Sequence, residues 1–105
     1  MSSILGNKLK FLREEKQITQ RQIASLLGID TATYCKIEKG DRRAKREQVF
    51  AISACLQADI KELLRFWSAD KVYDIIVNED EATQILNVVA EKIVNYKKQN
   101  YETTT

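Results

Sequence analysis

The sequence has no proline and no histidine, and it has only three glycines and two cysteines among its 105 residues. Because proline and glycine interrupt helices most strongly, their scarcity favours an all-α chain. Without histidine, the most frequent general base and transition-metal ligand is missing. We therefore expect no metal, no cofactor and no catalytic residues, since no other group of side chains points to a reaction.

The two cysteines, Cys35 and Cys55, lack the spacing of a metal site. No apolar run approaches the roughly 18 residues that span a bilayer, and the N-terminal residues are too polar for a secretory signal peptide. These features favour a cytoplasmic protein in which the cysteines stay reduced and no membrane is a partner.

Charge is distributed unevenly along the chain. Residues 1–50 contain eleven Lys and Arg against six Asp and Glu, whereas residues 51–105 contain six against nine. The first half is therefore positive by five charges and the second negative by three, with the densest basic stretch between Lys36 and Arg46. A positive half is attracted to a polyanion and a negative half is repelled by one. A solvated face without a partner would show the same composition.

Capping signals divide the first forty residues into three predicted helices, over about 4–16, 19–27 and 31–39. Thr19 and Gln22 have the spacing of a capping box that opens the second helix. Gly28 and Gly40 supply the left-handed residue that ends the second and the third, and Asp30 is a suitable N-cap for the third.

The later helices have weaker signals. A fourth helix follows the basic loop 41–44, a short fifth runs to about Phe66, another begins at Ser68, and a last one reaches about Tyr101. This pattern predicts a domain over 1–66, a helical C-terminal extension over 67–101 and a disordered tail over 102–105.

Two short helices joined by Gly28-Ile29-Asp30 have the length and turn chemistry of a helix-turn-helix. The text TQRQIASLLGIDTATYCKIEKGDRR, residues 19–43, resembles the lambda-repressor-like (Cro/C1-type, Xre) helix-turn-helix family of DNA-binding proteins. The resemblance covers about residues 4–64. It implies an all-α, five-helix DNA-binding domain, followed here by an additional C-terminal helix or helices.

The resemblance also implies that the helix over 31–39 enters the major groove of double-stranded DNA. Its base-reading positions are Thr31, Ala32 and Lys36. The Ala32 methyl suits a thymine methyl, and the Lys36 ammonium suits guanine O6 and N7. A phosphate contact or plain solvation of Lys36 is an equal alternative.

The family's phosphate-binding positions are occupied by polar or basic residues: Thr19, Gln20, Thr33, Lys39, Arg42 and Arg43. Gln20 stands at a helix start, where the dipole favours an anion, although it is also acceptable there as an exposed residue without a task. Ala44 replaces a frequent proline of the family, so a looser basic loop is expected.

The resemblance further implies a largely buried ion pair between Arg13 and Glu38, which fixes the first predicted helix against the third. Tyr34 falls at a position that is usually apolar, so we expect its ring to be packed in the core and its hydroxyl to be exposed to solvent. Cys35 is interpreted as a small, partly exposed residue and not as a redox sensor.

In the last predicted helix, the apolar residues Ala82, Leu86, Val89, Ile93 and Tyr96 are spaced 4-3-4-3. This heptad spacing is that of a coiled-coil seam, and such a seam needs a partner. The helix either folds back on its own domain or pairs with a second subunit, and we favour a dimer. The surface that it covers is expected to include Phe66, Trp67, Val72 and Tyr73.

The leading hypothesis is a dimeric transcriptional regulator, a repressor or autoregulator that recognises inverted-repeat operators. Two recognition helices related by two-fold symmetry bind half-sites one helical turn apart. The alternative is a protein-interaction module, such as an antitoxin that masks a toxin with its C-terminal helices.

Overall fold

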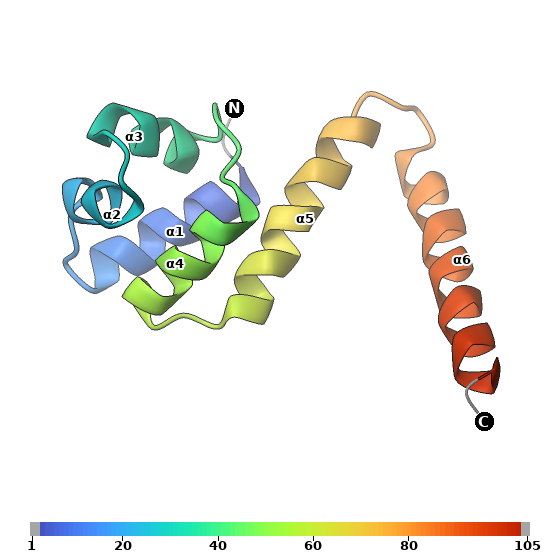
Figure 1. Cartoon of the computed structure of the whole chain (residues 1–105). Helices are drawn as coiled ribbons and strands as arrows, with labels where there is room; N and C mark the ends of the chain where they lie inside the picture. Colours follow the sequence, from blue (N-terminus) through green and yellow to red (C-terminus); the bar gives the residue numbers. More distant parts are fainter. Residues whose placement is uncertain (1–2, 104–105) are drawn as a thin grey trace. The chain divides into compact units, whose positions relative to one another are not determined.

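The computed structural model describes the backbone of residues 3–103 and the side chains of residues 3–100. Within this range the chain forms helices joined by short turns and has no strand (Figure 1). The helices are α1 (Ile4–Glu15), α2 (Gln20–Leu27), α3 (Thr31–Lys39), α4 (Arg46–Leu56), α5 (Ile60–Ile76) and α6 (Ala82–Thr103). The predicted all-α fold with an additional C-terminal helix is confirmed. Residues 104 and 105 of the expected tail lie outside the described residues.

The caps that the sequence predicts for α2 and α3 are present. The Thr19 hydroxyl accepts a hydrogen bond from the Gln22 N–H, and the Gln22 side chain accepts one from the Thr19 N–H. The Asp30 carboxylate accepts from the Thr33 N–H at 2.6 Å. Gly28 and Gly40 end these helices at φ of 70° and 83°, values that cost a residue with a Cβ far more than glycine.

Helix α5 differs from the sequence prediction. A break between Phe66 and Ser68 was expected, but α5 is one continuous helix of 17 residues. Ser68 was interpreted as a helix start, yet serine is also acceptable inside a helix when no glycine or proline interrupts it. Phe66 and Trp67 pack against the core, so tertiary contacts hold the helix together where the sequence signal is weak.

The core lies among the first five helices, each of which contributes one apolar face. α3 packs against α1 and α2, and α4 packs against α2. The buried apolar side chains are Leu5, Leu9, Ile23, Ala24, Tyr34, Ile37, Ala44, Val49, Ile52, Leu56 and Leu63.

The continuous α5 also carries a cap for α1. The two carboxylate oxygens of Asp70 accept hydrogen bonds from the Ile4 and Leu5 N–H groups at 2.8 and 3.0 Å. The first N–H groups of a helix have no partner within it, and its dipole favours a negative charge at this end. Asp70 therefore fastens the middle of α5 to the start of α1.

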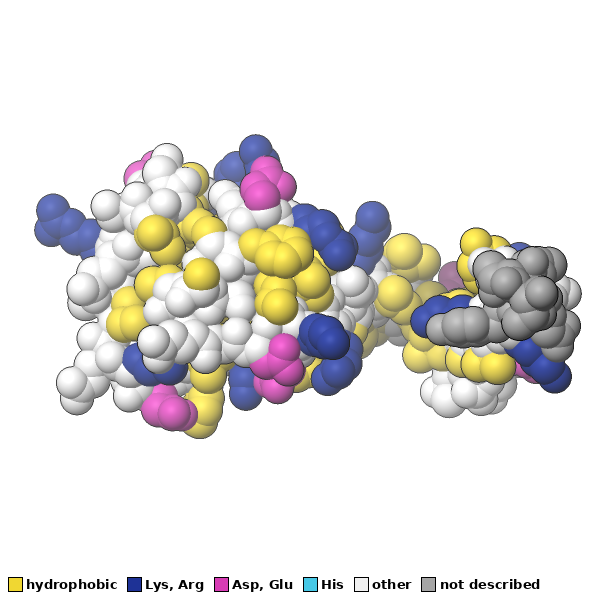
Figure 2. All heavy atoms as spheres, turned by 60° about the horizontal axis from the view of Figure 1, so that its bottom comes forward, with side chains coloured by type: hydrophobic (Ala, Val, Ile, Leu, Met, Phe, Trp, Pro, Cys, Tyr) yellow, Lys and Arg dark blue, Asp and Glu magenta, His cyan; other side chains and the backbone are white. Residues whose placement is uncertain are grey.

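The chain divides into two compact units between Lys71 and Val72. The first holds α1 to α4 and most of α5; the second holds the end of α5, the following turn and α6. In the second unit hydrophobic side chains reach the surface (Figure 2). Among the described residues, none of the helices is both long enough and apolar enough to cross a membrane.

Candidate nucleic-acid interface

Helix α3 lies at the outer edge of the first unit, joined to α2 by a short turn (Figure 1). Its buried face consists of Tyr34, Ile37 and Glu38. Its solvent-exposed side chains are the three predicted base-reading residues, Thr31, Ala32 and Lys36, together with Lys39; Thr33 is half-buried. The helix thus offers a short, uncharged N-terminal turn followed by two long cations.

A close contact with α1 fixes the position of α3. A Cβ at Gly6 would overlap the backbone carbonyl of Glu38. Only a residue without a side chain allows the two helix backbones to approach so closely.

A polar network joins the two helices next to this contact. The Arg13 Nε donates to Glu38 Oε2 at 2.7 Å, and its Nη2 donates to Oε1 at 3.2 Å. The remaining terminal nitrogen donates to the Ile18 carbonyl at 3.0 Å. Only 12% of the Arg13 side chain and 3% of the Glu38 side chain are exposed. Two hydrogen bonds between one guanidinium and one carboxylate, both largely shielded from solvent, make this ion pair strong and fix its geometry.

The electrostatics of Glu38 follow from its partners. Burial alone raises the pKa of its carboxyl, but hydrogen bonds from Arg13 and Gln20 outweigh burial and hold that pKa below its usual range. The same hydrogen bond to Glu38 raises the pKa of Arg13. Both groups are therefore charged at neutral pH, and the pair is an ion pair.

Gln20 belongs to this network as well. Its Nε2 donates to Glu38 Oε1 at 3.0 Å, which occupies one of its two amide hydrogens. Thr19 is engaged too, because its hydroxyl is part of the α2 cap. Thr19 and Gln20, both predicted to bind phosphate, therefore also make hydrogen bonds within the protein: Thr19 caps α2 and Gln20 binds Glu38.

The prediction of a wet Tyr34 hydroxyl is wrong. The residue is completely buried, and its hydroxyl has no hydrogen bond to any described residue. Burial, and then the nearby Glu38 carboxylate, raise the pKa of this phenol far above its ordinary value. Tyr34 is thus a neutral core residue. Cys35 is half-buried and free, as is Cys55.

The basic loop after α3 is held in place by Trp67 of α5. The indole N–H donates to the Ala44 carbonyl at 2.7 Å, and Ala44 itself is buried. The Arg43 guanidinium carbon lies 4.1 Å from the centroid of the indole ring, and that of Arg46 lies 5.7 Å from it. The expectation of a looser loop is therefore wrong, since a tryptophan from another helix fixes the loop without proline.

Two cations near the interface, Lys10 and Arg46, were not among the predicted site residues. Lys10 and Lys39 line one surface hollow together with Gln20. Arg46 lies at the start of α4 and meets Arg43 at the indole. The sequence signal for Lys10 was its place on the exposed side of the first helix, and that for Arg46 was its place at the end of the densest basic stretch. The contact of Arg46 with Trp67 had no sequence signal.

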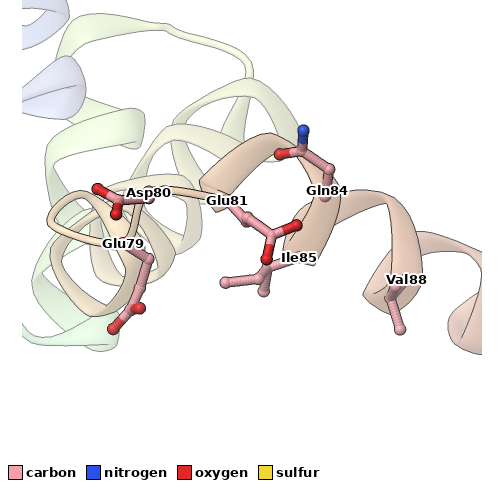
Figure 3. A pocket seen from close by; sticks show the side chains of 6 residues that line it. All are labelled: Glu79, Asp80, Glu81, Gln84, Ile85 and Val88. Carbon is pink, nitrogen blue, oxygen red and sulfur yellow. The ribbon is translucent and has the colours of Figure 1, made fainter.

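A second hollow lies within the C-terminal unit. Figure 3 shows that its lining includes three neighbouring carboxylates, those of Glu79, Asp80 and Glu81. The remaining lining residues are Gln84, Ile85 and Val88. Negative charge makes this hollow unsuitable for a phosphate backbone. No His, Cys, Asp and Glu side chains of the described residues form a group of three that would hold a metal ion.

Comparison with known proteins identifies the fold of the first unit. A family model described as a helix-turn-helix domain matches residues 6–65, from the first turn of α1 into α5. The chain is also 32% identical over 84 residues to an uncharacterized HTH-type transcriptional regulator, YqaE, of Bacillus subtilis strain 168. That alignment covers 80% of this chain and 68% of the relative. The chain belongs to the Xre-like helix-turn-helix family of DNA-binding proteins.

Proposed function

We propose that the protein is a transcriptional regulator that binds operator DNA as a homodimer, with α3 of each subunit in the major groove. The observation that carries this proposal is the division of α3 into two faces. One face is fixed by the core and by the Arg13–Glu38 pair. The other leaves Thr31 and Ala32 exposed in the first turn and Lys36 exposed further along the helix, on the side from which such helices reach base edges.

The base-reading roles follow from chemistry. The Lys36 ammonium donates to guanine O6 or N7, and the methyl groups of Thr31 and Ala32 contact thymine methyl groups. Base choice thus depends on one long donor and two short side chains, so each half-site has few specified positions.

Most of the affinity then comes from phosphates. Lys39 ends the recognition helix, Arg42 and Arg43 follow it, and all three are exposed. Thr33 and the second amide hydrogen of Gln20 add neutral donors. Thr19 contributes by capping α2 and keeping Gln20 in place. Each neutralised phosphate releases about one counterion, so affinity falls steeply with salt.

Dimerisation is supported by the apolar seam of α6. Leu86, Val89, Ile93 and Tyr96 are each at least two-fifths exposed in the free chain, and their spacing is that of a coiled coil. Val72 and Tyr73 at the end of α5 are also exposed and extend the apolar surface of this unit. A dimer that occupies an inverted repeat blocks other proteins there, which makes repression or autoregulation the simplest outcome.

The deciding experiment is selection of bound sites from random duplex DNA with the full chain, followed by footprinting at two salt concentrations. We expect enrichment of inverted half-sites about one helical turn apart and weaker protection at higher salt. No enrichment together with salt-independent binding would overturn the proposal.

A second candidate is favoured by the same exposed seam. An antitoxin-like protein would use α6 to cover a toxin and bind DNA secondarily. Sedimentation equilibrium of the purified chain distinguishes the two, because the regulator is a dimer through α6, whereas a chain that awaits a different partner remains a monomer.

A further inference from the structure

Trp67 is the only tryptophan of the chain, and it lies in α5, outside the helix-turn-helix. Its ring nonetheless reaches the basic loop, where it bonds the Ala44 carbonyl and faces the guanidinium groups of Arg43 and Arg46. An indole that only filled a gap in the core would not need these three polar partners.

The loop poses an electrostatic problem that this arrangement solves. Arg42, Arg43, Lys45 and Arg46 place four positive charges within five residues, and like charges repel one another. Long cationic side chains also lose rotamer freedom when a ligand orders them. The electron-rich face of an indole attracts guanidinium groups and limits their motion before any ligand arrives.

Stacking leaves the hydrogen-bonding capacity of arginine intact. The 4.1 Å between the Arg43 guanidinium carbon and the ring centroid fits stacking of the two planes, and a stacked guanidinium keeps its N–H donors pointing outward in its own plane. Two such donors match two oxygens of one phosphate. Arg43 can therefore stay on the ring and bind a phosphate at the same time, and Arg46 can do so at the neighbouring position.

We propose that Trp67 is a positioning residue that holds Arg43 and Arg46 as a preorganised pair for backbone phosphates of duplex DNA. This rests on the proposed function and extends the DNA-binding surface to Arg46 and to α5. Because the arginines are ordered in advance, less entropy is lost on binding. Since phosphates are alike in every sequence, Trp67 strengthens binding to all duplexes equally.

The first test compares Trp67→Leu and Trp67→Phe with wild type on one selected duplex and one random duplex over a series of salt concentrations. Trp67→Leu should weaken binding to both by about 3- to 30-fold and lower the salt slope by about one. Trp67→Phe keeps an aromatic face and should retain the salt slope. Unchanged affinity and slope in Trp67→Leu would overturn the role of Trp67.

A double-mutant cycle separates positioning from general loosening of the fold. Arg43→Ala should cost much less affinity in the Trp67→Leu background than in wild type, because the two residues act together. Arg42→Ala is the matched control: Arg42 lies in the same loop but not over the ring, so its effect should be the same in both backgrounds. Equal costs for Arg43→Ala in both backgrounds would contradict the proposal.

If Trp67→Leu does not fold, the fluorescence of Trp67 in the wild-type protein tests whether Arg43 and Arg46 bind DNA next to the indole. Duplex DNA should change the Trp67 fluorescence and its quenching by iodide in wild type, and this change should vanish in Arg43→Ala/Arg46→Ala. A change of the same size with millimolar inorganic phosphate alone would indicate a site for free phosphate and would also overturn the proposal. Failure of wild type to bind any duplex would reject the proposed function itself, whereas normal salt-dependent binding without these effects rejects only the role of Trp67.

Discussion

The Arg13 guanidinium meets the Glu38 carboxylate through two hydrogen bonds, the shorter of 2.7 Å, and so joins α1 to the recognition helix. Gln20 of α2 bonds the same carboxylate. Three helices thus share one buried anion, and the orientation of α3 depends on it. The network carries no base contact, yet it determines where the exposed face of α3 points.

Removal of one member of the pair should be costly. Arg13→Ala leaves the buried Glu38 without its cation, and a stranded buried charge costs roughly 3–5 kcal/mol of unfolding free energy. Urea denaturation followed by circular dichroism measures this loss. Arg21→Ala, which removes an exposed cation from α2, is the control and should change stability by less than about 0.5 kcal/mol. An Arg13→Ala midpoint close to that of the control would disprove the structural importance of the pair.

Stability should fall in acid because of Glu38. Its pKa is lower in the folded chain than in the unfolded chain, so the unfolded state binds the proton more readily. The stabilisation is complete above the unfolded pKa of about 4.3 and is lost as the pH falls through the folded value. Asp30, whose pKa is lowered mainly by its hydrogen bonds to Thr33, changes stability in the same direction.

Glu38→Gln isolates the contribution of Glu38 to this pH dependence. Urea midpoints of wild type and the variant, measured between about pH 7 and pH 2, should differ most at neutral pH and converge in acid. The Asp30 contribution is present in both proteins and cancels. If the difference between the two urea midpoints stayed constant over this pH range, the Glu38 charge would not account for the pH dependence.

Gly6→Ala should disturb the contact between α1 and α3. The added methyl meets the Glu38 backbone carbonyl, and forcing an extra carbon into a packed contact costs about 1–3 kcal/mol. Because α3 must move, DNA affinity should fall with stability. Gly28→Ala is the matched control: its Cβ meets nothing, but φ is +70°, so it costs about 1–2 kcal/mol of backbone strain without displacing α3. A Gly6→Ala protein as stable as wild type would refute the close approach.

Asp70→Ala should loosen the first turn of α1. It removes the carboxylate that accepts from the Ile4 and Leu5 N–H groups, and loss of such a cap costs about 1 kcal/mol. Hydrogen exchange at these two amides should accelerate, and the melting temperature should fall. Asp74→Ala, an exposed acid one turn later in α5, should leave both unchanged. Unaltered exchange in Asp70→Ala would rule out the cap.

The helices of the first unit could be predicted because their signals are local. A capping box, an Asp N-cap and two left-handed glycines mark the ends of α2 and α3 within a few residues of each other. The continuity of α5 could not be predicted in this way. It depends on Trp67 and Asp70, whose partners Ala44 and Ile4 are distant in sequence.

In the candidate site too, features that depend on local sequence could be predicted, and features that depend on distant residues could not. The exposure of Thr31, Ala32 and Lys36 follows from the helical period once Tyr34 and Ile37 are assigned to the core. The wet hydroxyl expected of Tyr34 and the looser loop expected from Ala44 were both wrong, because each depended on a residue of another element. The sequence shows that cations are present near the recognition helix, but it does not show which of them are already ordered.

Lys36→Ala and Lys39→Ala should separate base reading from phosphate binding. Both lysines are exposed at the second half of α3, so their loss leaves the core intact. If Lys36 donates to a guanine, its loss costs about 1–3 kcal/mol on the preferred half-site and relaxes preference at one position. If Lys39 contacts a phosphate, its loss weakens all sites alike and lowers the salt slope by about one.

Repeated site selection with the two variants, together with salt titrations on one selected and one random duplex, measures both effects. Lys97→Ala on α6 is a control, because it removes an equal charge from the second unit and should change neither. The two lysines would exchange roles if Lys36→Ala lowered the salt slope without altering the selected sequence. In that case Thr31 and Ala32 would be the remaining base-reading residues. Their two methyl groups would favour thymine, and the Thr31 hydroxyl would be the one hydrogen-bonding group left to read a base edge.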